Sequence, residues 1–185
     1  MKSKIIIVFC IWTTLTFSQE FNKEITLENA SKFMVGKINR KGLQAEPYNS
    51  WFNQGYGNYE VDYALVKMFK KRLAKHHVKL FLGTWCGDSK REVPRIIKIL
   101  DAAKFPMEQL EIIALDRRKE YYKKSATGEE EGLNIIKVPT MVFFKNRKEV
   151  NRIVESPIES LEEDMAQITN EKPYTPNYAT LSKAN

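Results

Sequence analysis

The alternation of apolar and polar residues predicts short helices and strands in the middle of the chain. An apolar run over 78–82 ends at Gly83 and predicts a buried strand. Residues 87–104 carry apolar side chains three and four positions apart, which indicates an amphipathic helix. A second strand is expected over 110–115, and helical spacing over 60–75 predicts a helix ahead of the first strand.

A hairpin and a helix are expected to follow. Residues 140–144 and 149–154 have the pattern of two strands joined by a short turn. Pro157 is expected to open the last helix, with Ser156 as its cap. Because a helix joins the first two strands, these should be parallel. The pattern therefore predicts an α/β domain with a mixed sheet of four or five strands flanked by helices.

The two ends of the chain have weaker patterns. Residues 27–38 place apolar side chains at roughly helical spacing, which predicts a helix with Thr26 as its N-cap. Residues 42–59 combine aromatic side chains with glycine, proline and asparagine, and we expect an aromatic loop packed on the domain, with a wall of the binding site as the alternative. No periodic pattern remains over 170–185, so a flexible tail is expected there.

The N-terminus has the composition of a secretory signal peptide. Lys2 and Lys4 precede an apolar run, and Ser18 supplies a small residue at the expected cleavage site. The run of roughly 13 residues is short for a membrane span, which needs about 20. An uncleaved anchor is one alternative. A lipoprotein anchored through Cys10 is another, but a bulky residue precedes that cysteine.

The overall composition narrows the classes of function. The 185 residues are 43% hydrophobic and 29% charged, as in a globular protein, so collagen-like and low-complexity classes are excluded. The net charge of +7 falls to +5 when the two lysines of the signal are removed, and the other basic residues are mixed with acidic ones. We therefore expect no nucleic-acid binding.

Cysteine and histidine are scarce. The chain has two cysteines, Cys10 and Cys86, which are too few for a framework of several disulfides. With two histidines in addition, a structural zinc site is not expected either. His76 and His77 follow a predicted helix, and we expect both on the surface.

Cleavage of the signal would leave Cys86 as the single cysteine of an exported chain. It follows the first strand and begins the second helix, where unpaired N–H groups and the positive end of the dipole stabilise a thiolate. Cysteines so placed have pKa values lowered from about 8.5 to roughly 3.5–7.5. Lys90 and Arg91 add positive charge, while Asp88 opposes it. The pattern indicates a reactive thiol, with a buried structural cysteine as the alternative.

Several motifs then point to a known family. Residues 85–89 read Trp-Cys-Gly-Asp-Ser, which resembles the Trp-Cys-Gly-Pro-Cys active site of thioredoxins. Pro94 lies where thioredoxins carry a helix-kinking proline, and residues 138–140, Val-Pro-Thr, resemble the family's Ile-Pro-Thr, whose proline is cis. The strand and turn over 141–146 also match. The resemblance covers about residues 60–169 and implies a thioredoxin fold, in a secreted bacterial protein of the thioredoxin-like family with a CxxS-type motif.

The resemblance also implies roles for residues. Cys86 would be the nucleophile that attacks a substrate disulfide, and the backbone before the cis-proline would pair with an extended substrate strand. The expected catalytic residues are Cys86 and Ser89, and the expected substrate-binding residues are Trp85, Gly87, Asp88, Val138, Pro139 and Thr140.

Departures from the family limit the expected chemistry. Ser89 stands where the resolving cysteine belongs, so it can hydrogen-bond the Cys86 thiolate but cannot resolve a mixed disulfide. Leu80 replaces a buried aspartate that assists the second cysteine. The segment over 116–139 is longer than in small thioredoxins, and Glu155 lies where the family carries a glycine.

The Cys-Gly-Asp-Ser string is also similar to the Cys-Gly-Phe-Ser motif of monothiol glutaredoxins, which hold iron–sulfur clusters with glutathione. Trp85 before the cysteine and the charge of Asp88 differ from that pattern. The glycine pair that those proteins carry after the cis-proline strand is missing as well. We therefore expect no cofactor and no metal.

The sequence is thus divided into a signal peptide (1–18), an N-terminal extension (19–58), a thioredoxin-like domain (59–169) and a flexible tail (170–185). The expected function is a monothiol thiol–disulfide oxidoreductase or isomerase in the periplasm or outside the cell. Its partners would be protein thiols and disulfides or a low-molecular-weight thiol, with no nucleic acid and no stable membrane insertion. A redox-inactive polypeptide-binding module on the same scaffold is the alternative.

Overall fold

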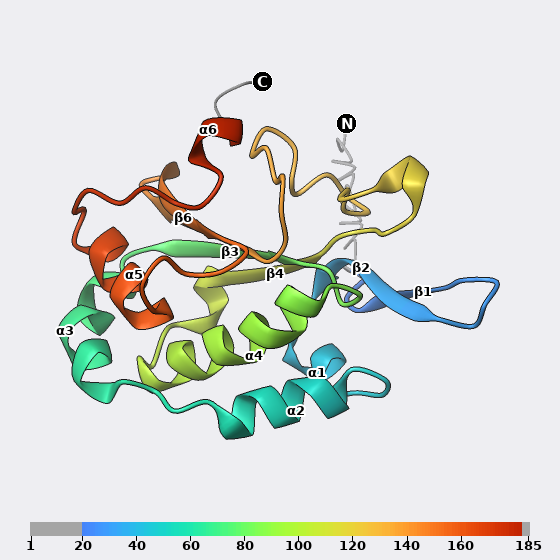
Figure 1. The fold of residues 1–185 in the computed structure, drawn as a ribbon, viewed down its shortest axis with the longest axis horizontal. Helices are drawn as coiled ribbons and strands as arrows, with labels where there is room; N and C mark the ends of the chain where they lie inside the picture. Colours follow the sequence, from blue (N-terminus) through green and yellow to red (C-terminus); the bar gives the residue numbers. More distant parts are fainter. Residues whose placement is uncertain (1–19, 183–185) are drawn as a thin grey trace, which may run out of the picture.

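The computed structural model describes residues 20–182, and a six-stranded mixed sheet in the order β1-β2-β4-β3-β5-β6 forms its centre (Figure 1). The predicted signal peptide lies outside the described residues. The strands are β1 (Lys23–Thr26), β2 (Lys32–Ile38), β3 (His77–Leu82), β4 (Leu110–Ala114), β5 (Thr140–Lys145) and β6 (Lys148–Val154). The helices are α1 (Arg40–Leu43), α2 (Asn49–Asn58), α3 (Tyr63–Leu73), α4 (Gly87–Ala102), α5 (Leu161–Thr169) and α6 (Ala179–Ser182), with short 3-10 turns η1 (Met107–Gln109) and η2 (Lys119–Tyr121).

The sheet has one parallel pair at its centre. β3 and β4 are parallel and are joined by α4, which confirms the predicted crossover. β5 is antiparallel to β3, and β6 is antiparallel to β5, so the predicted hairpin is confirmed too. Together with α5, these elements make the α/β thioredoxin fold that the sequence predicted. Within the described residues, no helix is long and apolar enough to cross a membrane.

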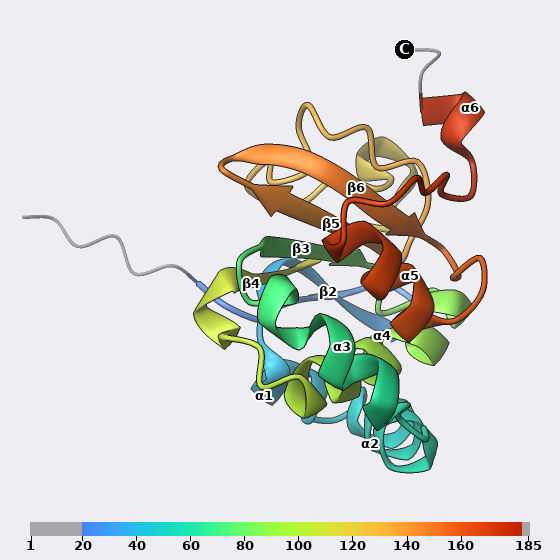
Figure 2. The ribbon, with the colours of Figure 1, turned by 90° about the vertical axis from the view of Figure 1, so that its left-hand side faces the viewer.

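The two faces of the sheet are covered differently. Figures 1 and 2 show α1 to α5 on one side, where side chains such as Leu80 and Leu82 of β3 join the larger core cluster. Phe81, between them in sequence, points to the other face and belongs to a smaller cluster with Ile113 and Val142. Irregular chain between β4 and β5 covers this second face. Cys86 and Trp85 pack against the smaller cluster, so this irregular chain adjoins the predicted site.

The predicted helix over 27–38 is wrong. These residues form the turn and the second strand of an antiparallel hairpin of β1 and β2, and the sheet has six strands instead of the expected four or five. Ala30 has a φ of +62° in the turn, a left-handed conformation that stops a helix. Consecutive residues Phe33, Met34 and Val35 are all buried, because β2 is covered on both faces. A strand buried in this way lacks the alternation that would have identified it.

The predicted aromatic loop over 42–59 is also wrong, because this stretch holds the end of α1 and all of α2. Phe52 is buried, and α2 packs on α4 (Figure 1). A Cβ atom added to Gly55 would lie 2.6 Å from Cγ of Pro94. Gly55 therefore allows α2 and α4 to approach closely and does not form a turn. The loop prediction failed because glycine was taken as a turn residue.

The last helix begins later than predicted. Ser160, rather than Ser156, caps α5, and its hydroxyl accepts a hydrogen bond from the Glu163 amide at 3.1 Å. Pro157 lies before the helix, in a segment of bends. The cap is followed by three acidic residues in the first turn, which favour the positive end of the helix dipole.

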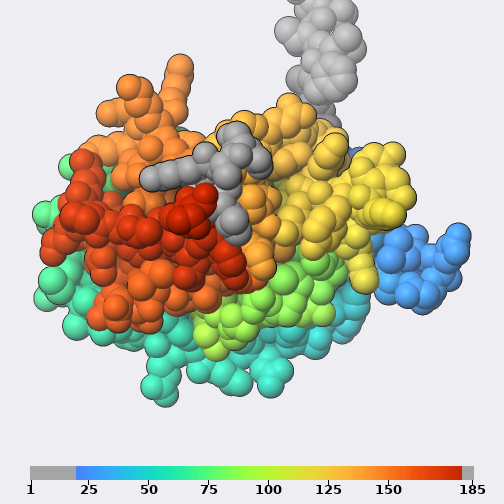
Figure 3. Space-filling view, turned by 45° about the horizontal axis from the view of Figure 1, so that its top comes forward, coloured from blue at the N-terminus to red at the C-terminus, as the bar shows by residue number. Residues whose placement is uncertain are grey.

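The segment after α5 makes defined contacts with the domain. The Tyr174 hydroxyl donates to the buried Asp164 carboxylate at 2.6 Å, and the Asn151 side chain of β6 donates to the Tyr174 carbonyl at 2.9 Å. Figure 3 shows this segment, in red, lying against the orange residues of the β5–β6 region. The division of the chain into domains, including a flexible tail over 170–185, stays a prediction.

His76 does not lie on the surface as expected, although His77 does. Only 1% of His76 is exposed, and its ring meets Phe143 edge-on with the ring centroids 6.4 Å apart. Its Nδ1 atom hydrogen-bonds to the Arg72 carbonyl at 2.9 Å, while Nε2 is buried without a partner. Burial lowers the pKa of His76, because a charged ring would lose its hydration.

Candidate functional site

Cys86 lies at the junction of β3 and α4. It is the N-cap residue of α4, which confirms its predicted place at the start of that helix. Its amide donates to the Gly83 carbonyl at 2.8 Å, and its carbonyl accepts from the Lys90 amide at 3.0 Å. Its side chain caps no N–H group and is partly exposed. A partner molecule can therefore reach this thiol beside the unpaired N–H groups of the first helical turn.

The loop before β5 meets the cysteine. The Cys86 thiol donates to the Val138 carbonyl with Sγ 3.3 Å from the oxygen. The Val138–Pro139 peptide bond is cis. Thr140 is buried, and its hydroxyl donates to the Lys137 carbonyl at 2.7 Å. The structure thus brings Cys86 and the loop over 138–139 together, while Thr140 anchors that loop.

Ser89 is turned toward the end of β3. It is fully buried, and its hydroxyl accepts a hydrogen bond from the Gly83 amide at 3.1 Å. This contact ties the first turn of α4 to the strand that precedes it. Leu80 is also fully buried and lies in the apolar core. Thioredoxins carry a buried aspartate at the corresponding position. The predicted hydrogen bond between Ser89 and a Cys86 thiolate stays a prediction.

Trp85 is fixed on the other side of the cysteine. Its indole Nε1 donates to the Leu115 carbonyl at 2.9 Å, and its ring lies against Tyr122 with the centroids 5.8 Å apart. A Cβ atom added to Gly83 would lie 2.7 Å from Cε2 of Trp85. Glycine is therefore required before the motif to let the indole lie over the backbone.

The rim of the site is polar and open. Gly87 is exposed, and a Cβ atom added there would meet no atom within 4 Å. Asp88 pairs with Arg91 one turn later in α4, at 2.8 Å between Oδ1 and Nη1. The acidic side chain beside the thiol is thus partly neutralised by its own helix.

A charged cluster that sequence reasoning missed flanks Pro139. Lys137 pairs with Glu155 at 3.3 Å, and the Glu155 amide donates to the Pro139 carbonyl at 2.7 Å. Tyr178 joins them, since its hydroxyl donates to Glu155 and its ring centroid is 4.8 Å from the Lys137 ammonium. Glu155 has a φ of +66°, so it adopts the left-handed conformation that glycine takes easily. The missing family glycine was the one sequence signal for this cluster.

The segment between β4 and β5 supplies a second group that was missed. The Tyr122 ring lies against Trp85, and the Lys123 ammonium lies 5.1 Å from the Tyr122 centroid, although nothing in the sequence pattern of this polar stretch marked them. Asp116 is 4% exposed and binds Arg118 at 2.7 Å, which fixes the start of the segment. Side chains placed by irregular chain leave no periodic signal.

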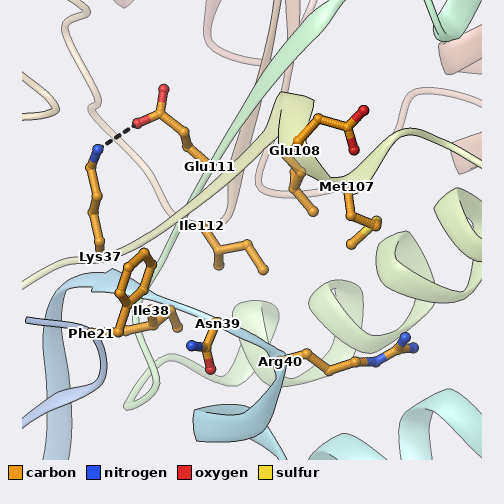
Figure 4. A pocket seen from close by; sticks show the side chains of 10 residues that line it. Phe21, Lys37, Ile38, Asn39, Arg40, Met107, Glu108, Glu111 and Ile112 are labelled. Atoms are coloured by element: carbon orange, nitrogen blue, oxygen red, sulfur yellow. Dashed lines mark ion pairs between the residues drawn. The ribbon is translucent and has the colours of Figure 1, made fainter. Parts of the chain in front are cut away.

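A mostly apolar cavity of about 560 Å³ lies away from this site (Figure 4). Phe21 and Met107, both exposed, are among its lining residues, and so is Leu110 at the start of β4. Leu110 pairs with Val78 at the start of β3, whereas Cys86 follows the end of that strand. The cavity therefore lies at the opposite end of the strands from the thiol.

Metal ligands do not cluster within residues 20–182: no group of three or more His, Cys, Asp or Glu side chains could hold an ion there. Among these described residues, the chemistry that the arrangement supports is that of a single, partly exposed thiol. A thiolate at this position can attack an electrophilic sulfur or carbon.

Comparison with known proteins identifies a similar structure but no family. A scan against protein-family models found no match, and a search of curated proteins found none either. Among solved structures, the chain is similar to thioredoxin O2 from Arabidopsis thaliana in its oxidized state. The two share 24% sequence identity over 64% of this chain and 86% of that chain, with a TM-score of 0.37. The thioredoxin fold of this chain is defined by its own strand order, by the β3–α4–β4 crossover and by the β5–β6 hairpin.

Proposed function

We propose that the protein is a monothiol thiol–disulfide oxidoreductase or isomerase that acts on disulfides of exported proteins. The observation that carries the proposal is the position of Cys86, at the N-terminus of α4 and beside the loop that holds Pro139. Ser89 at the second position of the motif limits the chain to one thiol at this site.

The proposed reaction has two exchanges. First, the Cys86 thiolate attacks one sulfur of a substrate disulfide; the Cys86–substrate bond forms as the substrate S–S bond breaks, and the departing thiolate takes a proton from water. Second, another thiolate attacks the mixed disulfide and frees Cys86. A thiolate of the substrate itself rearranges its disulfides with no net redox change. Two external thiols instead reduce the substrate to a dithiol and are themselves joined as a disulfide.

The partners follow from the same site. A polypeptide that reaches Cys86 in extended form would run beside the backbone of Val138 and over the exposed Gly87. The external reductant would be a low-molecular-weight thiol. A periplasmic or secreted location is part of the proposal, and it is supported by the signal-like composition of residues 1–18.

Trapping of the mixed disulfide tests the proposal. The full chain is incubated with glutathione disulfide, quenched with acid and mapped by mass spectrometry, with Cys86→Ala as the matched control. We expect one glutathionyl group on the peptide that contains Cys86 and its release by dithiothreitol. If Cys86 stays unmodified while glutathione disulfide reacts with a free cysteine in the same solution, the exchange function is wrong. A redox-inactive polypeptide-binding module would then be the better description.

A further inference from the structure

The loop before β5 accepts hydrogen bonds from both the Cys86 thiol and a lysine side chain. In the chain leading to β5, the Val138 carbonyl accepts from the Cys86 thiol, and the Ile136 carbonyl accepts from the Lys123 ammonium. These carbonyls are two residues apart. The ammonium and the sulfur are therefore held by neighbouring parts of the same short segment, although they come from different parts of the chain.

A contact between two aromatic rings joins the same two parts of the chain. The Tyr122 ring lies against the Trp85 ring with the centroids 5.8 Å apart, and the Lys123 ammonium is 5.1 Å from the Tyr122 centroid. Trp85 is the residue directly before Cys86. The backbone of Lys123 is held as well, since its amide donates to the Asp116 carbonyl at 2.9 Å. The residue before Lys123 is thus in contact with the residue before Cys86.

The charges around the sulfur come from three elements. α4 contributes Asp88, which is paired with Arg91, while the loop before β5 and the residue directly after β6 contribute the Lys137–Glu155 pair. The contacts of Lys123 differ, because its ammonium binds a carbonyl oxygen and an aromatic face. Burial lowers the pKa of Lys123, and nearby Lys137 lowers it further, whereas Glu155 and a Cys86 thiolate raise it. A negative charge at Cys86 therefore favours the charged form of Lys123.

We propose that Lys123 is a positioning residue for Cys86. The positive charge of the Lys123 ammonium stabilises the Cys86 thiolate and favours its formation. This inference rests on the proposed exchange function, in which the thiolate is the nucleophile.

The test is the rate of Cys86 alkylation by iodoacetamide against pH, read by mass spectrometry on the Cys86 peptide of the full chain. For Lys123→Met we expect the midpoint of the profile to rise by about half a pH unit and the rate below the midpoint to fall about threefold. Lys123→Arg keeps the charge and should restore the native profile. Lys119→Met, which removes an exposed lysine in η2, is the matched control and should match the native protein.

A midpoint for Lys123→Met equal to that of Lys119→Met would overturn the inference. Urea unfolding of each variant shows whether the fold is intact, and a Lys123→Arg variant that folds but keeps the raised midpoint would also contradict a charge effect. The two proposals separate in this design. A shifted midpoint without any glutathionyl adduct would reject the exchange function alone, whereas an adduct with an unshifted midpoint would reject the role of Lys123 alone.

Discussion

Replacing Ser89 by cysteine is the sharpest test of the single-thiol chemistry. The variant gains a second thiol in the first turn of α4, but it loses the hydroxyl that accepts from the Gly83 amide at 3.1 Å. Sulfur is a weak acceptor, and a poorly satisfied buried N–H group costs about 1–3 kcal/mol. Because Ser89 is fully buried, the larger sulfur adds a packing cost. We expect the reduced variant to be about 2 kcal/mol less stable than the native protein, close to a 4–8 °C lower Tm.

Two assays separate the chemistry from the stability. Reduction of insulin by dithiothreitol, followed as turbidity, should be barely accelerated by the native protein and clearly accelerated by Ser89→Cys, because the new thiol can resolve the mixed disulfide. Ser89→Ala is the matched control, since it loses the same hydroxyl acceptor and gains no thiol. It should lose a similar amount of stability in urea unfolding and show no gain in insulin reduction.

The reasoning is refuted by either of two results. Native protein that reduces insulin as fast as Ser89→Cys would show that no second thiol is needed at this position. Ser89→Ala with native stability would show that the hydrogen bond to Gly83 contributes nothing to the junction of β3 and α4.

The other predictions concern stability. Tyr174→Phe removes a hydroxyl bonded to the buried Asp164 carboxylate, so we expect a loss of about 1.5–3 kcal/mol in urea unfolding; the exposed Tyr63→Phe should change little, and equal stability of the two variants would contradict docking of the C-terminal segment. Burial lowers the folded-state pKa of His76, so the unfolded chain binds its proton first and stability should fall as the pH drops below about 6.5, by up to about 1.4 kcal/mol at pH 5.5. His76→Gln should lose this dependence in urea unfolding at pH 5.5 and 7.5, while His77→Gln should keep it; a native-like pH dependence in His76→Gln would reject the assignment.

The sequence predicted those elements whose pattern of buried and exposed residues is regular. β3, α4 and the β5–β6 hairpin have regular periods and defined ends, so their limits and the place of Cys86 followed from the chain alone. β2 did not follow, because Phe33, Met34 and Val35 are all buried and no alternation remains. Lys123 was missed for another reason. It lies in an irregular segment whose position depends on tertiary contacts, and such contacts leave no periodic pattern in the sequence.

The end strands of the sheet have a consequence for the behaviour of the protein at high concentration. An outermost strand offers unpaired backbone groups to which a strand from another copy can add, and charged side chains oppose such addition. β1 carries Lys23 and Glu24, both exposed, and Glu24 also pairs with Lys32 at 2.9 Å. At the other end, the Asn151 side chain of β6 binds the Tyr174 carbonyl of the C-terminal segment. Charge at one margin and a docked segment at the other thus discourage edge-to-edge aggregation of the folded chain.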